Sequence, residues 1–272
     1  MRRKAIGILV AMGLISFAIQ ADDFWVKKDW KEWTEYDCRQ MLQDSPWARS
    51  TGVGLPVSAH AYLPNDGNSV SKEMRTPSGG GDAIRYVVAD WSTAPVRQAY
   101  IRLAQIQNNY EKMDPALKKE FDAKAENFLN EKFGNVILIH VTYGGGGSGS
   151  GGESPAEYWR TVSEDQVLKS AFLINQREER IPAAQFISPK GAEPVFELVF
   201  PRLQRGEPAV QQNDKSFSIE FQGPGLRLEY PMADTGTAPE DQPPPKVRLG
   251  GQARVLAVFD AQKMMWLGSP NM

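Results

Sequence analysis

The sequence predicts an α+β fold, with a mostly antiparallel β-sheet, two central helices packed on it and an N-terminal helix. Residues 94–110 and 114–133 repeat apolar side chains at helical spacing, which indicates two amphipathic helices. The C-terminal third instead contains short segments in which apolar and polar residues alternate, separated by turn formers. An almost continuous apolar segment, NVILIHVTY at 135–143, indicates a strand buried on both faces. We therefore expect one sheet, with both helices on one face, in a single mature domain at 22–272.

The N-terminus has the three parts of a secretory signal peptide. A basic RRK start is followed by an apolar run to Ile19, and AIQADD offers a cleavage point after Ala21. The apolar run is shorter than the roughly 20 residues that a membrane-spanning helix needs, and no second such run follows. The sequence therefore predicts a signal peptide at 1–21, a periplasmic or secreted mature chain, and no transmembrane span after cleavage.

The composition describes a chain that can build a hydrophobic core without disulfides. Hydrophobic residues make up 41% of the sequence, and the chain has a single cysteine, which cannot form a disulfide within it. The formal net charge is only −2, so no general affinity for phosphate backbones is expected. We therefore expect burial to supply the stability, and we expect no nucleic-acid partner.

A short helix is predicted at 34–45, near the start of the mature chain. Thr34 and Asp37 have the spacing of a capping box, with Asp where Glu or Gln is usual. Pro46 disfavours helical geometry at Ser45, so the helix should end there.

The lone cysteine, Cys38, shares one face of this helix with Met41 and Leu42. No Lys, His or Cys lies at helical spacing to lower its pKa, so we interpret Cys38 as a buried, inert thiol. Four of the seven tryptophans also fall in this part of the chain: Trp25, Trp30, Trp33 and Trp47. They either dock on a partner or membrane surface or seal the edge of a core, and packing is the commoner role of large aromatic side chains. Trp30, Trp33, Cys38 and Trp47 are therefore the candidate structural or docking residues.

Short strands, short helices and two loops of unusual composition complete the predicted elements. Two more helices are predicted at 155–162 and 163–172, and strands at 56–63, 83–91, 195–203, 217–222, 226–230, 253–260 and 263–268. A glycine-rich loop at 144–154 and a proline-rich loop at 231–246 separate some of these elements.

No motif predicts a catalytic, cofactor-binding or metal-binding residue. The glycine-rich loop matches G-x-G-x-x-G almost by chance, and Pro155 begins the next helical stretch too late for a dinucleotide loop. No G-K-[ST] follows, which excludes a P-loop. His60 and His140 are far apart in the sequence and form no metal-ligand spacing, so structural roles are expected for both. The prediction is therefore no cofactor and no metal.

Four segments resemble a group of secreted bacterial proteins of unknown activity that are common in acidobacteria. The segments are WTEYDCRQMLQDSPWA, WSTAPVRQAYIRL, FELVFPR and FDAQKMMWLG. That group shares an SPWA helix end, an S-A-x-P-V-R-Q-A helix start and an F-x-x-x-x-M terminus, whereas this chain has Ser-Thr-Ala-Pro at the helix start and its own glycine-rich insertion. The resemblance implies export and a common fold, and it transfers no activity and no site residue.

Two classes of function remain compatible with the sequence. The favoured class is a non-enzymatic binding or scaffold protein of the cell envelope, with an envelope protein as the candidate partner, because no nucleophile, metal cluster or phosphate loop can be assembled. The alternative is a secreted hydrolase or carbohydrate-active protein whose carboxylates and tryptophans converge only in the fold. A pocket with two carboxylates roughly 5–10 Å apart beside a tryptophan would favour the alternative, and a flat sheet with exposed aromatics would favour the first class.

Overall fold

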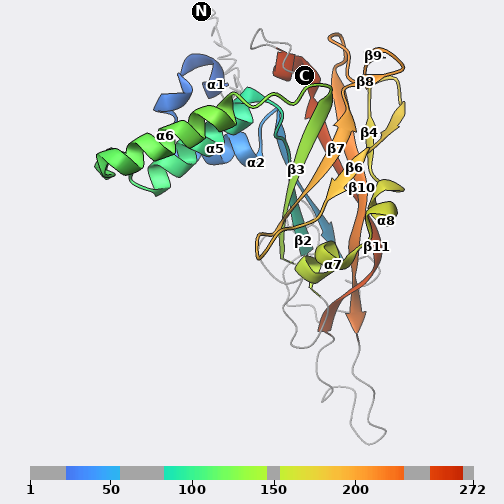
Figure 1. Ribbon diagram of the computed structural model, residues 1–272. Coiled ribbons are helices and arrows are strands. Elements are labelled where there is room, and N and C mark those ends of the chain that lie inside the picture. The colour runs from blue at the N-terminus through green and yellow to red at the C-terminus, as the bar shows by residue number, and fades with distance from the viewer. Residues whose placement is uncertain (1–22, 56–82, 146–153, 230–245, 266–272) are drawn as a thin grey trace, which may run out of the picture.

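The strands of the protein form two main sheets that face each other, in a computed structural model that describes residues 23–55, 83–145, 154–229 and 246–265 (Figure 1). The five-stranded sheet has the order β1 (Ala48–Gly54), β2 (Ala83–Asp90), β3 (Val136–Gly145), β7 (Val195–Pro201) and β6 (Gln185–Ile187). The four-stranded sheet has the order β11 (Lys246–Asp260), β10 (Ser216–Glu229), β4 (Phe172–Ile174) and β5 (Arg180–Pro182). A small ribbon pairs β8 (Leu203–Gln204) with β9 (Glu207–Pro208). All these pairings are antiparallel, so the α+β class is confirmed, whereas the single sheet expected from the sequence is wrong.

The core lies between the two sheets because each sheet presents one row of large apolar side chains. In β3 the buried residues are Ile137, Ile139, Val141 and Tyr143, and the residues between them are half-buried or exposed. The segment is therefore fully buried on one face only, which corrects the expectation of two buried faces. The second sheet covers the first through residues such as Phe217, Ile219 and Phe221 of β10, and two facing sheets are the common solution for strands of this kind.

Aromatic rings fill the space between the sheets. Phe221 of β10 packs edge-on against both Tyr86 of β2 and Phe196 of β7, with ring centroids 5.6 Å apart in each pair. Trp159 of α7 (Pro155–Thr161) is fully buried and stacks on Phe196 at 4.0 Å. A Cβ at Gly223 would lie 2.7 Å from the Tyr86 hydroxyl oxygen, so β10 needs glycine at this close approach.

The two sheets are linked along both of their edges. On one side, Nε of Arg49 in β1 donates a hydrogen bond to the Val258 carbonyl of β11 at 3.0 Å. On the other side the chain passes from β5 to β6 through Ala183 and Ala184, whose N–H groups donate to the Ala171 carbonyl just before β4 and to the Val199 carbonyl of β7. Strands of three residues therefore occupy this second edge, and short edge strands limit pairing with other chains.

The helices between residues 24 and 129 extend from one end of the sandwich (Figure 1). They are α1 (Phe24–Lys27), the 3-10 turn η1 (Trp30–Glu32), α2 (Glu35–Gln43), α5 (Ala94–Gln107), the 3-10 turn η2 (Tyr110–Lys112) and α6 (Pro115–Leu129). Helix α2 contacts β1 and β2, whereas α5 packs mainly on α2, α6 and η1. The two central helices thus exist as predicted but do not cover a sheet face, because the second sheet already does so.

Helix α6 is weakly covered along its length. Ala125 is its one buried residue, and Leu117, one of the apolar residues at helical spacing, is 56% exposed. The predicted span of 114–133 shortens to Pro115–Leu129, and the side chain of Asp114 accepts a hydrogen bond from the Ala116 N–H at 2.8 Å as its N-cap.

The C-terminal elements differ from the prediction in two places. The strands expected at 217–222 and 226–230 are one strand, β10, whose register against β11 shifts between Pro224 and Leu226. Residues expected to begin a last strand instead form α9 (Ala261–Met265), where the Asp260 carboxylate accepts from the Lys263 N–H at 3.1 Å. The two short helices predicted after the glycine-rich loop are present as α7 and α8 (Glu164–Leu168), but the second is shorter than the predicted 163–172, and Phe172 begins β4.

Several predicted segments lie outside the described residues. These are the signal peptide at 1–21, the strand at 56–63 that contains His60, most of the glycine-rich loop and most of the proline-rich loop. Gly144 and Gly145 continue β3, and Lys246 begins β11. Among the described helices, none has the length and apolar character needed to cross a bilayer.

Candidate functional site

Helix α2 has the predicted capping box at its N-terminus and the predicted buried face, and it ends at Gln43, two residues before the predicted end at Ser45. The Thr34 hydroxyl accepts from the Asp37 N–H at 3.2 Å, and the Asp37 carboxylate accepts from the Thr34 N–H at 3.0 Å, which completes the capping box. Cys38 and Met41 are fully buried and Leu42 is partly buried. Burial raises the pKa of the Cys38 thiol to about 11. This geometry is that of a packing cysteine.

The end of this helix turns Trp47 into the core. The Ser45 hydroxyl donates to the Met41 carbonyl at 2.8 Å and accepts from the Trp47 N–H at 3.2 Å. Trp47 and Trp33 are each 2% exposed, and Trp47 packs edge-on against Trp25 at 5.8 Å. Three of the four candidate residues, Trp33, Cys38 and Trp47, are therefore packing residues in the folded chain.

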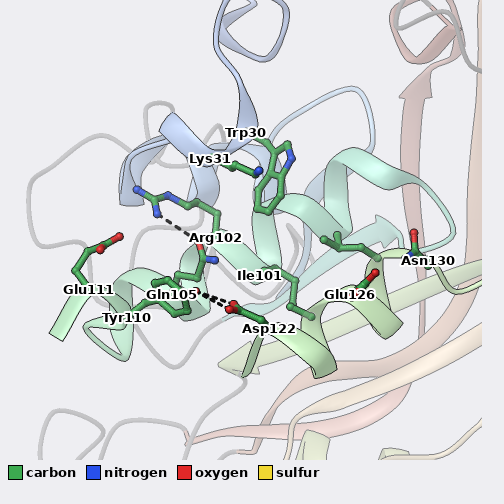
Figure 2. Close-up of a pocket in the computed structure, with 12 residues that line it drawn as sticks. Trp30, Lys31, Ile101, Arg102, Gln105, Tyr110, Glu111, Asp122, Glu126 and Asn130 are labelled. Atoms are coloured by element: carbon green, nitrogen blue, oxygen red, sulfur yellow. Dashed lines mark hydrogen bonds between the residues drawn. The ribbon is translucent and has the colours of Figure 1, made fainter. Parts of the chain in front are cut away.

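Trp30 differs from the other three candidates because it lines an open groove of about 680 Å³ (Figure 2). We call this groove, bounded by η1, α5, η2 and α6, the helical groove. The buried side chains of Ile101 and Ala125 lie at its base, and Leu129 is half-buried beside them. Its polar lining comprises Lys31, Arg102, Gln105, Tyr110, Glu111, Asp122, Glu126 and Asn130. The groove thus has an apolar base and a polar rim.

Hydrogen bonds fix the orientation of the polar side chains in the helical groove. Arg102 donates through Nε to the Trp33 carbonyl at 3.1 Å and through Nη1 to Oε1 of Gln105 at 3.3 Å. The Tyr110 hydroxyl donates to the Asp122 carboxylate at 2.7 and 2.9 Å, and this hydrogen bond raises the pKa of Tyr110 (Figure 2). Four of the eight polar side chains of the groove, those of Arg102, Gln105, Tyr110 and Asp122, therefore have hydrogen-bond partners within the protein.

A second aromatic group joins the helices to the outer face of the five-stranded sheet. Trp91 stacks on His140 at 4.3 Å and packs against Tyr100 of α5 and Phe128 of α6. Nδ1 of His140 lies 3.4 Å from a carboxylate oxygen of Glu197, its partner across β3 and β7. These contacts agree with the structural role expected for His140.

A buried carboxyl group holds the turn between β2 and α5. Asp90 is 2% exposed, and its carboxylate accepts hydrogen bonds from both the N–H and the hydroxyl of Ser92. Burial raises the pKa of Asp90 to about 6, although Ser92 and the nearby guanidinium groups of Arg202 and Arg97 oppose the rise. The sequence patterns did not point to this group, and its available signal was the D-x-S spacing of an Asx turn.

The groove residues on α5, η2 and α6 were also missed, because no motif connects them. Among the residues that the structure describes, no group of three or more His, Cys, Asp or Glu is placed to hold a metal ion. Comparisons of the chain with protein-family models, with curated proteins and with solved structures give no match.

Proposed function

We propose that the chain is an exported, non-enzymatic binding protein of the cell envelope, and that the helical groove holds its ligand. The observation that supports this proposal is the groove itself, where Trp30 lies beside fixed polar side chains over an apolar base (Figure 2). Ligand sites generally combine these features, because apolar surface supplies affinity and a few polar groups supply orientation.

The β-sandwich suits the role of a rigid support for this groove. Helix α2 contacts β1 and β2, and α5 packs on α2. Trp91, which packs against Tyr100 of α5 and Phe128 of α6, joins these two helices to the outer face of the five-stranded sheet. A site whose walls are already ordered loses less conformational freedom on binding, which improves affinity.

One observation favours the second class, a secreted hydrolase or carbohydrate-active protein. Asp122 and Glu126 are one turn apart on α6 and both line the groove with Trp30. Their Cβ atoms are therefore about 5–6 Å apart, so both carboxyl groups lie on one face of the helix, and a pair of carboxylates is what glycoside hydrolysis uses. Both residues are exposed, however, whereas a general acid that works near neutral pH needs a desolvated carboxyl group. Binding is therefore the better-supported proposal.

The proposal is tested by photo-crosslinking in the envelope of cells that export the chain. A photoreactive amino acid replaces Gln105, which lines the groove, and in a matched control it replaces Gln107, an exposed glutamine at the end of the same helix. We expect one defined adduct from position 105 that is absent from position 107 and disappears when Trp30→Ala is added. Equal adducts at both positions, or none at position 105, would contradict a ligand in this groove.

The hydrolase alternative has a separate readout. Release of reducing sugar from a purified envelope polysaccharide by the wild-type chain, abolished by Glu126→Gln, would favour catalysis over binding.

A further inference from the structure

We infer that the ligand of the helical groove is a carbohydrate, with a sugar ring against Trp30 and its hydroxyl groups on the polar rim. This inference rests on the proposed function and names the chemical class of its ligand. It follows from the charge, the hydrogen-bonding capacity and the shape of the groove.

The charges of the lining disfavour strongly charged ligands. Three carboxylates, Glu111, Asp122 and Glu126, face a groove that also contains the cations Lys31 and Arg102. An anionic ligand would meet the carboxylates, and a cationic ligand would meet the Arg102 guanidinium beside Gln105. A neutral ligand avoids both repulsions. A helical peptide with an apolar face is also a poor fit, because the apolar surface is confined to the base.

The polar side chains present donors and acceptors side by side. Oε1 of Gln105 accepts a hydrogen bond from Arg102, so the amide N–H groups of Gln105 are directed to other partners. The two hydrogen bonds that Arg102 donates come from Nε and Nη1, and neither comes from Nη2. Asp122 receives one Tyr110 hydroxyl across both oxygens, which leaves further lone pairs to accept. A sugar hydroxyl donates and accepts at once, so it can bridge such neighbouring groups.

The aromatic wall and the size of the groove also suit a carbohydrate. An indole ring offers a flat, polarisable surface to the C–H face of a sugar ring, and Trp30 lies at the edge of the groove (Figure 2). Nζ of Lys31 lies over the Trp30 ring at 5.8 Å from its centroid, so a sugar ring would pack on the indole next to this ammonium group. The volume of about 680 Å³ lies within the range of about 300–1,000 Å³ typical of small-molecule sites.

The test applies the purified mature chain, without its signal peptide, to a printed glycan array of neutral and amino-sugar oligosaccharides from bacterial envelopes. A second array of acidic, basic and apolar tetrapeptides is probed in parallel. We expect saturable binding to at least one glycan and none to the peptides. In titrations with the bound glycan, Trp30→Ala should weaken binding by about tenfold, as loss of a stacking ring does.

Two further variants keep this test decisive. Gln105→Ala should weaken glycan binding while leaving the melting temperature unchanged, because this half-buried side chain lies on the rim. Gln107→Ala, an exposed glutamine at the end of the same helix that does not line the groove, is the matched control and should bind as the wild type does. Binding that is indifferent to both groove variants, or binding to peptides alone, would overturn the carbohydrate assignment. A groove-specific crosslink to a protein, with no glycan bound, would overturn this assignment and leave the proposed binding function standing.

Discussion

Trp159 in the sandwich and Trp30 in the helices differ in how far each side chain is buried. In the sandwich, Trp159 is fully buried, because α7 inserts it among aromatic rings from both sheets. In the helical layer, Trp30 is half-buried, because η1 places it at the edge of a groove with a polar rim. The difference shows that the role of an aromatic residue depends on whether a second apolar surface is available to cover it.

The same contrast appears between the two long helices. Helix α5 buries Val96, Ala99 and Ile101 against its neighbours, whereas α6 buries Ala125 alone. One wall of the groove is therefore anchored in the core and the other is largely solvated. On the α6 side the groove is lined by the polar Asp122, Glu126 and Asn130 as well as by Ala125 and Leu129.

The largest effect is expected from emptying the sandwich. Trp159→Ala should lower the free energy of unfolding by about 3–5 kcal/mol, because truncating a large buried aromatic leaves a cavity. Trp47→Ala, which removes the equally buried ring behind α2, should have an effect of the same size. Urea denaturation of both variants measures these changes. A loss below about 1 kcal/mol in either variant would show that the ring is not packed as described.

The next effect concerns the reactivity of Cys38. A pKa of about 11 in place of 9.0 reduces the thiolate fraction near pH 8 by about 100-fold, and burial further limits access. A thiol reagent should therefore react at least about 100-fold more slowly with the native chain than with the chain in guanidinium. Rapid labelling of the native protein would contradict the packing role of α2.

The Asp90 carboxyl group should introduce a pH dependence into the stability. Its pKa is raised to about 6 in the folded protein from an ordinary value of 3.8, so the folded state binds the proton more tightly than the unfolded chain does. Its ionisation therefore weakens the fold as the pH rises from about 4 to about 6. Asp90→Asn keeps an oxygen acceptor for Ser92 and removes the charge. The stability of this variant relative to wild type should rise by on the order of 2 kcal/mol between pH 4 and pH 7.

Asp37→Asn is the control for this experiment. Burial of Asp37 opposes its ionisation, but hydrogen bonds from Thr34 and Lys28 outweigh that effect and lower the pKa. Asp37 therefore stabilises the fold above the pKa of the unfolded chain, and this contribution is lost as the pH falls through the folded pKa. Relative to wild type, the free energy of unfolding of Asp90→Asn should rise with pH, and that of Asp37→Asn should fall with pH, each over the range in which its carboxyl group titrates. Parallel profiles would contradict the environment described for Asp90.

The smallest effect on stability is expected at the groove. Trp30→Ala should lower the free energy of unfolding by no more than about 1 kcal/mol, because its ring is half-buried and leaves no enclosed cavity. Urea denaturation beside Trp159→Ala measures the contrast directly. A loss as large as that of Trp159→Ala would make Trp30 a core residue and remove the distinction between the two regions.

Elements whose signals are local could be predicted from the amino-acid sequence. The capping box of Thr34 and Asp37, Pro95 in the first turn of α5, and the alternation of apolar residues along β10 and β11 each act within a few residues. Hydrogen bonding and side-chain sterics at that range do not depend on the rest of the chain, so the α+β class, the longer helices and the long strands other than β1 could be predicted, whereas β1 and the strands of two or three residues were not.

Which surfaces of the strands and helices pack together could be seen only in the folded protein. The apolar rows of the strands could be covered by helices or by a second sheet, and the pattern of each strand is the same in both cases. The helical groove likewise combines Trp30 with Arg102 and Asp122, which lie on three elements far apart in the sequence and share no motif. Trp30 and Trp47 lie in the same tryptophan-rich segment of the sequence, yet Trp30 lines a groove and Trp47 is buried. The physical reason is that burial depends on long-range packing, which sets the partners of each side chain only when the whole chain is folded.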